Sequence, residues 1–368
     1  MFTFNNTTEV HFGAGVLQTV DTVLERYGYK SYVVIASNSQ VKNGITELLD
    51  SLLPGQIKAV VSDIEENPTV GNVDDIINAA NEHGAEALIA VGGGSTMDAA
   101  KAAAAAVVKN VDARTIIYDK NITEALPVIA LPSTSGSASE VTPFSVISDK
   151  EKGVKTSISG KALYPKIAFV DPELTYTCPP KVTAISGIDV ICHALDSLGA
   201  VNSNPISDSL AVTALRLAFS NLDTAYREGA NAKARSNMAL ASATAGIGFS
   251  QTATSGSHAM SYYLTSEFDI PHAEACAFSL DQWILHNAKA ESKLDEVSVQ
   301  LGFENTEALS KELNELKKRL GLRTTFEELG IERKHIPEIA RRTMTAGNYK
   351  NNIAQLSEEE IIEMLETK

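Results

Sequence analysis

The chain has 368 residues, of which 44% are hydrophobic and 21% are charged, and its formal net charge is −15. This composition is typical of a folded globular protein, and the length predicts two domains rather than a single core. The acidic balance argues against nucleic acid or an anionic membrane surface as the main partner, because both bind basic surfaces.

The first residues, MFTFNNTTEVHFG, contain no basic stretch followed by an apolar run, so we expect no secretory signal. The most apolar long tract, DAAKAAAAAVV, is interrupted by Lys101 and predicts a buried helix rather than a membrane span. The chain has only three cysteines, an odd number, which does not favour a disulfide framework. We therefore expect a protein of the reducing cytoplasm.

The first half of the chain alternates short β-branched runs with amphipathic helical stretches such as 15–28 and 70–84. The expected strands are 32–36, 58–62, 87–91, 128–131 and 167–170. From about Lys181 onward, strand signals disappear and helical periods dominate. We therefore expect an α/β domain over residues 1–177, with a largely parallel sheet covered by helices on both faces, and an all-helical domain over residues 178–368.

A glycine-rich turn follows the third expected strand, in the segment ALIAVGGGSTMDAAK. Gly92, Gly93 and Gly94 allow the backbone to approach a pyrophosphate, because a Cβ would hold the phosphate away. The helix expected to begin at Ser95 offers N–H groups and the positive end of its dipole to an anion. We expect Ser95 to cap this helix, with Asp98 at the capping-box position. The alternative is a tight turn that binds no ligand.

A second loop, ALPSTSGSASEVTP, follows the strand expected at 128–131 and is rich in hydroxyl groups. Its hydroxyl-bearing residues include Ser133, Thr134, Ser135, Ser137 and Ser139. Such side chains can hydrogen-bond a ribose, a phosphate or a nicotinamide amide. The alternative is a serine-rich loop in contact with solvent.

Candidate metal ligands occur in the second half of the chain. In SGIDVICHALDSLGA, Asp189 and His193 are four residues apart, so their side chains share one face of a helix. The later segment SGSHAMSYYLTSEFDIPHAEACA places His258 in a helical stretch and His272 after Pro271. One carboxylate and three imidazoles suit a divalent transition metal such as Fe²⁺ or Zn²⁺. By itself, an Asp–His pair at this spacing is more often a surface or packing feature.

Taken together, these segments resemble the iron-containing alcohol dehydrogenase family, within the superfamily that also holds glycerol dehydrogenase and dehydroquinate synthase. The resemblance covers nearly the whole chain and is carried, in order, by EVHFGAGVL, EENPTV, GGGSTMDAAK, LPSTSGSASEVTP, FVDPELT, GIDVICHAL and HAMSYYLTSEFDIPHAEA. It implies a Rossmann-like dinucleotide-binding α/β domain and an all-helical metal-binding domain. It also implies hydride transfer between a nicotinamide and a small aldehyde or alcohol whose oxygen is polarised by a divalent metal.

The resemblance assigns roles to residues at matching positions. The residues at the family's four metal-ligand positions, all of the family's residue types, are Asp189, His193, His258 and His272. They imply an Fe²⁺ site that Zn²⁺ or Mn²⁺ can also enter. The residues that match the pyrophosphate loop and the second cofactor loop are Gly93, Gly94, Ser95, Asp98, Ser133, Thr134 and Ser137.

Four further positions bear on the cofactor and on acid–base chemistry. Lys155 matches a family lysine near the cofactor and active site, although a lysine in DKEKGVK is also explained as a surface residue. Tyr262 replaces a histidine found in many members, and is either a proton donor in the pocket or an aromatic wall residue. Glu274 replaces a common glycine, and either supports the metal or faces solvent. Ser37 stands where NAD-preferring relatives often have an aspartate, which predicts a preference for NADP(H).

The sequence leaves the substrate open. The HAMSY, LTS and IPH segments resemble the phosphonoacetaldehyde reductase (hydroxyethylphosphonate dehydrogenase) subgroup, and a simple short-chain aldehyde or diol fits as well. The alternatives are a zinc-type polyol dehydrogenase, a dehydroquinate-synthase-like lyase and, less favoured, a metal-bound scaffold without catalysis. Family members are usually dimers or larger, so we expect a homo-oligomer.

Overall fold

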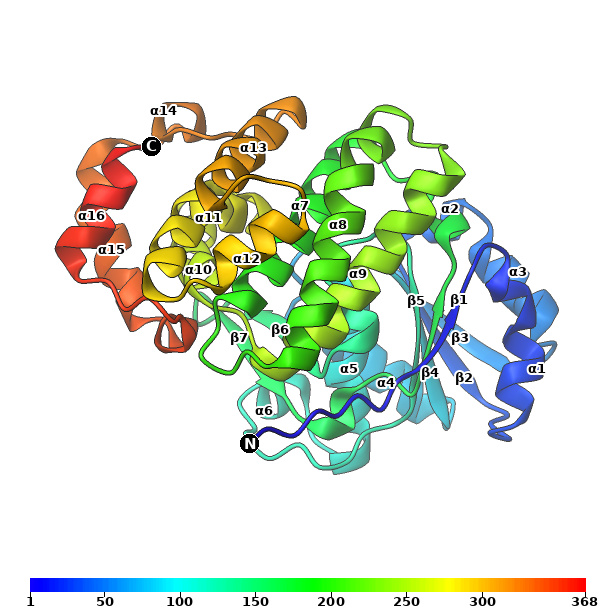
Figure 1. Cartoon of the computed structure of the whole chain (residues 1–368). Helices are drawn as coiled ribbons and strands as arrows, with labels where there is room; N and C mark the ends of the chain where they lie inside the picture. The colour runs from blue at the N-terminus through cyan, green and yellow to red at the C-terminus, as the bar shows by residue number, and fades with distance from the viewer. The chain divides into compact units, whose positions relative to one another are not determined.

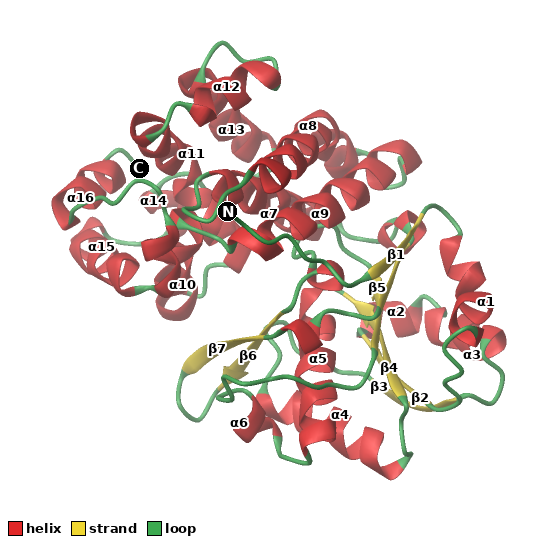
Figure 2. Ribbon diagram, turned by 60° about the horizontal axis from the view of Figure 1, so that its bottom comes forward, coloured by secondary structure: helices red, strands yellow, loops and turns green.

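The computed structural model describes all 368 residues, and these form two compact units (Figures 1 and 2). One unit comprises Asn6–Thr177, and the other combines Met1–Asn5 with Cys178–Lys368. The first unit holds every strand and the second contains helices, so the predicted fold class is confirmed.

Six parallel strands form the main sheet of the α/β unit, in the order β1-β8-β5-β4-β2-β3. These strands are β1 (Glu9–Phe12), β2 (Tyr32–Ala36), β3 (Ile57–Val61), β4 (Ala87–Gly92), β5 (Val128–Pro132) and β8 (Ile167–Val170). The five predicted strands are confirmed, each within one residue of its predicted bounds. Strand β1 and an antiparallel hairpin of β6 (Phe144–Asp149) and β7 (Val154–Ser159) go beyond the prediction.

Helices cover both faces of this sheet (Figure 2). The helices of the unit are η1 (Val16–Thr19), α1 (Val20–Glu25), α2 (Asn38–Lys42), α3 (Ile45–Leu52), α4 (Val70–Glu82), α5 (Gly94–Lys109), α6 (Ala113–Ile116), η2 (Ser139–Val141), η3 (Lys161–Leu163) and η4 (Pro172–Thr175). Successive side chains of a strand point to opposite faces, so β2 supplies both cores. Val33 and Ile35 pack with residues of α4 and α5, whereas Val34 and Ala36 pack with residues of α1 and α3.

The second unit is built from helices alone. They are α7 (Pro180–Leu198), α8 (Pro205–Arg227), α9 (Ala232–Thr252), α10 (Gly256–Phe268), α11 (His272–Ala290), α12 (Lys293–Gln300), α13 (Thr306–Arg319), α14 (Phe326–Leu329), η5 (Arg333–His335), α15 (Ile336–Thr345), η6 (Gly347–Asn351) and α16 (Glu358–Glu366). One hydrophobic core joins α7, α8, α9, α12 and α13, and a second joins α10, α14, α15 and α16. Helix α11 contributes to both, which fixes its position between them.

Helix α7 is the most deeply placed element of the helical unit, because almost all of its residues after Gly187 are buried. Gly187 itself allows close contact with α8: a Cβ there would lie 2.1 Å from Leu222 Cδ1. The polar residues that α7 carries, Asp189, His193 and Asp196, are therefore held in a rigid interior rather than on a surface.

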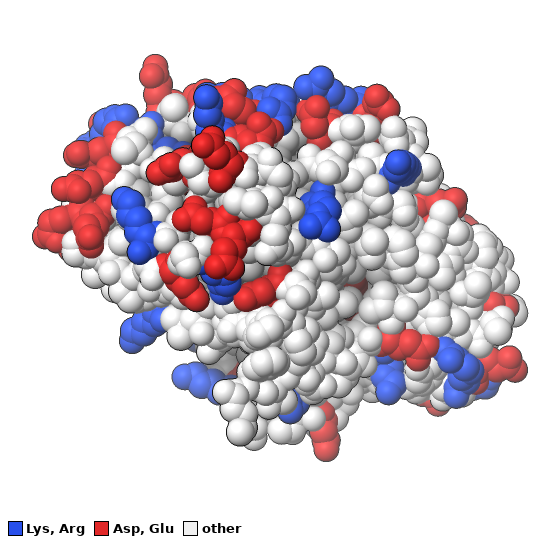
Figure 3. Space-filling model, viewed as in Figure 1, with Lys and Arg blue, Asp and Glu red and all other residues white.

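The surface carries mixed charge. On the face drawn in Figure 3, Lys and Arg side chains are scattered among Asp and Glu and form no continuous basic patch. None of the helices combines the length and the apolar content that crossing a lipid bilayer would require.

Candidate active site

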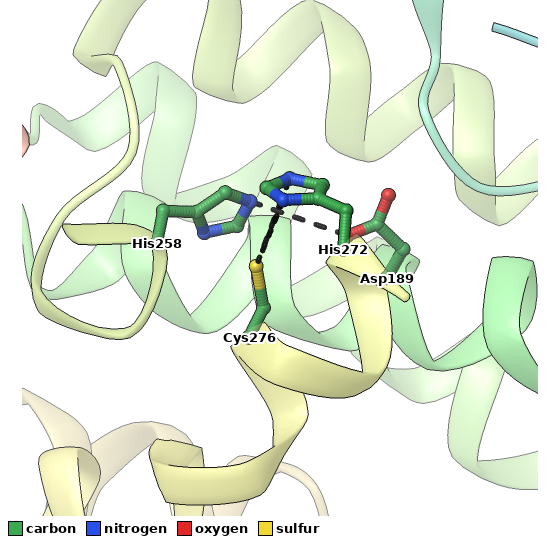
Figure 4. A group of neighbouring side chains, drawn as sticks. All are labelled: Asp189, His258, His272 and Cys276. Atoms are coloured by element: carbon green, nitrogen blue, oxygen red, sulfur yellow. Dashed lines mark hydrogen bonds and ion pairs between the residues drawn. The ribbon is translucent and has the colours of Figure 1, made fainter. Parts of the chain in front are cut away.

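Four side chains of the helical unit form a cluster whose ligand atoms all lie within 4.8 Å of one another (Figure 4). This ligand cluster consists of Asp189 from α7, His258 from α10, and His272 and Cys276 from the first turns of α11. Asp189, His258 and Cys276 are buried and His272 is half-buried. Three of the four predicted metal ligands therefore meet in one place.

Two atoms of the ligand cluster lack the partners that buried polar groups normally have. Asp189 Oδ1 and His258 Nε2 are buried without a hydrogen-bond partner, an arrangement that costs free energy unless another group satisfies them. They lie 4.0 Å apart, which is too long for a hydrogen bond. Two atoms that each lie about 2.1 Å from a shared metal ion are separated by at most about 4.2 Å. The geometry thus fits a divalent transition metal.

Asp196 orients His258 toward the ligand cluster. Its Oδ2 lies 2.8 Å from His258 Nδ1, and it also accepts hydrogen bonds from Ser255 N (2.9 Å) and Ser257 Oγ (2.9 Å). Burial raises the pKa of Asp196, but these hydrogen bonds outweigh burial and hold the pKa below its ordinary value. A carboxylate on Nδ1 leaves Nε2 for a metal. Sequence reasoning missed Asp196, although it lies two helical turns after Asp189 on the same face of α7.

His193 lies beside the ligand cluster rather than among its four closest members. Its Nδ1 is 3.9 Å from Asp189 Oδ2, and its ring stacks between Phe249 (4.1 Å between centroids) and His258 (4.9 Å). Cys276 takes the fourth place in the cluster, with its Sγ 3.7 Å from His272 Nε2. Sequence reasoning missed Cys276, although its spacing of four residues from His272 places both on one helix face.

Tyr262 and Glu274 have different surroundings. The Tyr262 ring stacks on His272 with 6.4 Å between centroids, and its hydroxyl accepts a hydrogen bond from Asn348 Nδ2 at 2.9 Å. Glu274 is buried, and its carboxylate accepts hydrogen bonds from Arg323 Nε (2.9 Å) and Nη2 (2.7 Å). The idea that Glu274 faces solvent is therefore wrong: a buried carboxylate needs a partner, and Arg323 provides it.

In the α/β unit, the two predicted cofactor loops lie against each other. A Cβ on Gly94 would lie 2.6 Å from Ser137 Oγ, and one on Gly93 would lie 3.4 Å from Thr134 Oγ1. Ser133 N donates to the Gly92 carbonyl oxygen at 2.9 Å, which continues the β4–β5 pairing into the loops. The second loop is not a solvated surface loop, because its serines at 133, 135 and 139 are buried.

The prediction that Ser95 caps the following helix is wrong. Helix α5 begins at Gly94, and its N-cap is Gly93, which has no side chain to form a capping hydrogen bond. Ser95 Oγ instead accepts a hydrogen bond from Asn67 N (3.4 Å), and Asp98 accepts one from Ser139 Oγ (2.6 Å). A glycine cap leaves the first N–H groups of α5 available to an anion, which suits a phosphate-binding role.

Lys155 and Ser37 both lie near the glycine loop: Lys155 is connected to it through Asn67, and Ser37 follows the neighbouring strand β2. Lys155 is exposed on β7, and its Nζ donates to Asn67 Oδ1 at 2.9 Å, so that Asn67 connects it to Ser95. Ser37 directly follows β2, and its Oγ lies 3.1 Å from Ser39 Oγ. An acid does lie near this turn, but it comes from the segment after β3: Asp63 accepts a hydrogen bond from Asn38.

Two buried ionisable residues, Lys101 and Glu140, lie at the second loop. Lys101 Nζ donates to Ser139 Oγ (2.6 Å) and to the carbonyl oxygens of Thr142 and Phe144 (both 2.9 Å). Burial lowers the pKa of Lys101 to about 8 and raises the pKa of Glu140 to about 7. Folding therefore places an acid and a base in the interior, where each tends toward its neutral form.

Glu140→Gln is expected to flatten the pH dependence of stability between about pH 4.5 and 7. In the folded chain Glu140 keeps its proton up to about pH 7, whereas the unfolded chain releases it near 4.5. This group therefore contributes stability at low pH that is lost as the pH rises to 7. We expect the variant to gain about 3 kcal/mol at pH 8 relative to pH 4.5. Urea unfolding at both pH values measures this, and a parallel shift of both proteins would contradict it.

Comparison with known proteins decides the family. Residues 7–172 match the profile of iron-containing alcohol dehydrogenase, and residues 183–368 match the C-terminal profile of the Fe-containing alcohol dehydrogenase family. The chain belongs to the iron-containing alcohol dehydrogenase family. It is thus an oxidoreductase of the alcohol dehydrogenase type, as its sequence predicts.

Several known dehydrogenases and reductases are similar to the chain over most of its length. The crystal structure of sulfoacetaldehyde reductase from Bifidobacterium kashiwanohense, in complex with NAD⁺, has a TM-score of 0.96 and 32% identity, covering 100% of this chain and 98% of that one. Sulfoacetaldehyde reductase from Bilophila wadsworthia is 29% identical over 97% of this chain and 96% of its own length. 1-Propanol dehydrogenase from Salmonella typhimurium is 33% identical over 84% of this chain and 80% of its own length.

Proposed function

We propose that this dehydrogenase reduces a small aldehyde with NADPH at a divalent metal, Fe²⁺ in the first instance. The residues proposed to hold the metal are Asp189, His193, His258 and His272. The observation that carries the proposal is the pair of buried atoms, Asp189 Oδ1 and His258 Nε2, that have no hydrogen-bond partner and lie 4.0 Å apart. When bound, such a metal supplies Lewis-acid polarisation of the substrate oxygen.

His193 is proposed as the fourth ligand in preference to Cys276. It follows Asp189 by one turn of α7, and its Nδ1 is already 3.9 Å from Asp189 Oδ2. Rotation of the imidazole about its Cβ–Cγ bond moves both ring nitrogens while the buried helix stays in place, and this torsion is soft in histidine. Cys276 then lies beside the metal as a thiol rather than binding it.

The chain's own residues bind and orient the reactants. Asp196 holds His258 with Nε2 toward the ligand cluster, through a 2.8 Å contact to Nδ1. The glycine loop and the first turn of α5 are proposed to bind the cofactor pyrophosphate, with Ser133, Thr134 and Ser137 alongside. Lys155 is proposed to act near the cofactor, since Asn67 connects it to the loop.

Tyr262→Phe is expected to lower kcat/KM for aldehyde reduction by about 100-fold, because Tyr262 is proposed to donate a hydrogen bond or proton to the substrate oxygen. The hydroxyl accepts from Asn348 and so keeps its own hydrogen for the substrate, while the ring stacks on His272. Steady-state kinetics over a range of pH measures this. Full activity with an unchanged pH profile would show that Tyr262 is only a wall residue.

NADPH is proposed as the preferred cofactor because Ser37 places no carboxylate at the end of β2 to repel a 2′-phosphate. The nearby Asp63 carboxylate, which accepts a hydrogen bond from Asn38 Nδ2 at 2.5 Å, comes from the segment after β3 rather than from the end of β2. Ser37→Asp is expected to lower kcat/KM with NADPH about tenfold or more and to leave NADH turnover nearly unchanged. A higher kcat/KM with NADH than with NADPH in the unaltered protein would overturn the preference.

The substrate is proposed to be a short aldehyde, with phosphonoacetaldehyde and simple aldehydes as the first to test. NADPH oxidation over a panel of short aldehydes tests this directly. Net turnover excludes a lyase, which would use the nicotinamide only transiently, and a preference for diols would favour the polyol dehydrogenase. Absence of turnover on every substrate, with metal and cofactor bound, would favour a non-catalytic scaffold. We further propose a homodimer or larger homo-oligomer in the cytoplasm.

A further inference from the structure

An open cavity of about 370 Å³ lies in the helical unit. Its lining comes from the segment after α7, the α9–α10 turn and η6, and comprises Val201, Asn202, Ala253, Thr254, Gly347, Asn348, Lys350 and Asn351. This lining includes one base and no acid, in a chain with 46 acidic and 31 basic residues. Lys350 is exposed and forms no ion pair. The local charge therefore suits an anionic occupant.

Two contacts connect this cavity to the ligand cluster. Asn348 lines the cavity and donates through Nδ2 to the Tyr262 hydroxyl at 2.9 Å. The Tyr262 ring in turn stacks on His272, with 6.4 Å between centroids and 10° between the planes. A short molecule with one end at the ligand cluster therefore has its other end near Asn348.

The hydrogen bonds of Asn348 determine what the cavity offers to a ligand. Its amide nitrogen donates to Thr254 Oγ1 (2.5 Å) as well as to the Tyr262 hydroxyl (2.9 Å). Each hydroxyl has one hydrogen and can accept as well as donate. Because both oxygens accept from Asn348, both hydroxyl hydrogens remain for a ligand. The Tyr262 hydrogen serves the reacting oxygen of the substrate, and the Thr254 O–H and the Lys350 ammonium form a pair of donors that suits an oxyanion.

We propose that Thr254 and Lys350 form a subsite for the anionic end of the substrate, a sulfonate or phosphonate on a short aldehyde. Asn348 is a positioning residue that keeps both hydroxyls directed as donors. This inference rests on the proposed reductase function and adds the class of substrate to it. The carbonyl end lies at the ligand cluster and the charged end lies in the cavity.

Lys350→Gln tests the subsite through substrate discrimination. We expect kcat/KM for sulfoacetaldehyde and phosphonoacetaldehyde to fall about tenfold or more, because a charge-assisted hydrogen bond is lost. For uncharged propanal we expect kcat/KM of Lys350→Gln to stay within about twofold of the unaltered chain. Lys350→Arg, which keeps the positive charge, is expected to retain most of the activity on the charged aldehydes. The matched control is Lys233→Gln, an exposed lysine near the other end of the 21-residue helix α9, about 30 Å along the helix from Thr254.

Asn348→Asp tests the positioning role. A carboxylate only accepts, so it takes the hydrogens of both hydroxyls and adds a negative charge. We expect kcat/KM for propanal to fall no further than in Tyr262→Phe, because Tyr262 loses its hydrogen in both variants, whereas KM for the charged aldehydes rises by a further factor of about 100. An equal loss of kcat/KM on charged and uncharged aldehydes would show that Asn348 does not position the subsite. Thermal unfolding of the variant shows whether the fold is retained, and the Lys350 variants test the subsite independently.

Binding of an inert anion separates this inference from the reductase proposal. Calorimetry with 2-hydroxyethanesulfonate needs no turnover, and we expect about tenfold weaker binding to Lys350→Gln than to the unaltered chain. If no aldehyde is reduced but this difference appears, the reductase proposal fails and the subsite stands. If aldehydes are reduced and Lys350→Gln affects neither binding nor discrimination, the subsite is wrong and the reductase stands.

Discussion

Asp189→Ala is expected to lose bound metal and to lower kcat for aldehyde reduction by about 1,000-fold or more. The carboxylate supplies the only anionic oxygen among the proposed ligands, and its Oδ1 is one of the two atoms left without a hydrogen-bond partner. Polarisation of the carbonyl oxygen contributes several kcal/mol to a metal-assisted reaction, which corresponds to this factor. Metal analysis of the purified variant and single-turnover kinetics measure the two effects.

Matched variants distinguish loss of a ligand from general damage. His193→Ala is expected to lose metal as Asp189→Ala does, whereas Cys276→Ser is expected to retain it. Asp223→Ala removes a carboxylate of α8 that pairs with Arg227 on the surface, and is expected to change neither metal content nor kcat. Full metal occupancy in His193→Ala together with loss in Cys276→Ser would assign the fourth ligand position to the thiolate.

Asp281→Ala is expected to lower the free energy of unfolding by about 3–5 kcal/mol, because it leaves two buried ammonium groups without a counter-charge. Lys317 Nζ lies 2.5 Å from Asp281 Oδ1, and Lys368 Nζ lies 2.6 Å from Oδ2. Burial raises the pKa of Asp281, but the two lysines outweigh burial and hold it below its ordinary value. Urea unfolding at neutral pH measures the loss.

Two further variants test whether the loss of stability comes from the buried charges. Glu315→Ala, which removes an exposed partner of Lys318, is expected to change stability by less than about 0.5 kcal/mol. The triple variant Asp281→Leu, Lys317→Met, Lys368→Met is expected to recover most of the stability, since no unpaired charge remains. A loss below about 1 kcal/mol in Asp281→Ala would show that water reaches the lysines.

The parallel strands could be predicted to within a residue because each buried strand is a continuous apolar run, as in Tyr32–Ala36 and Ala87–Gly92. Strand β1, Glu9–Phe12, lies at the sheet edge, so only alternate residues are shielded and its sequence EVHF lacks that signal. The hairpin strand β7, with its sequence VKTSIS, is mostly exposed and reads as a loop. Strand β1 and the hairpin strands therefore escaped prediction because partner strands, rather than apolar runs, define them, whereas β3 at the other edge keeps the apolar sequence IKAVV.

The ligand cluster could be predicted only in part. Asp189 and His193 share a helix face by spacing alone, and His258 and His272 were candidates by residue type. Resemblance to the family gave all four the role of metal ligand. Asp196 and Cys276 lie at helical spacings from predicted ligands, and that signal was available. Asn348 gave no such signal, because 86 residues separate it from Tyr262 and only the folded chain brings the two together. Local spacing reveals neighbours on one helix but not contacts between helices.

The most direct test of metal-assisted aldehyde reduction is an anaerobic titration. The purified chain is freed of metal with a chelator, and NADPH oxidation with a short aldehyde is followed while Fe²⁺ is added. We expect negligible turnover without metal, and activity that rises in proportion to bound metal until the site is filled. Turnover that persists unchanged in the metal-free chain, or no turnover on any aldehyde with the metal site filled, would contradict the proposal.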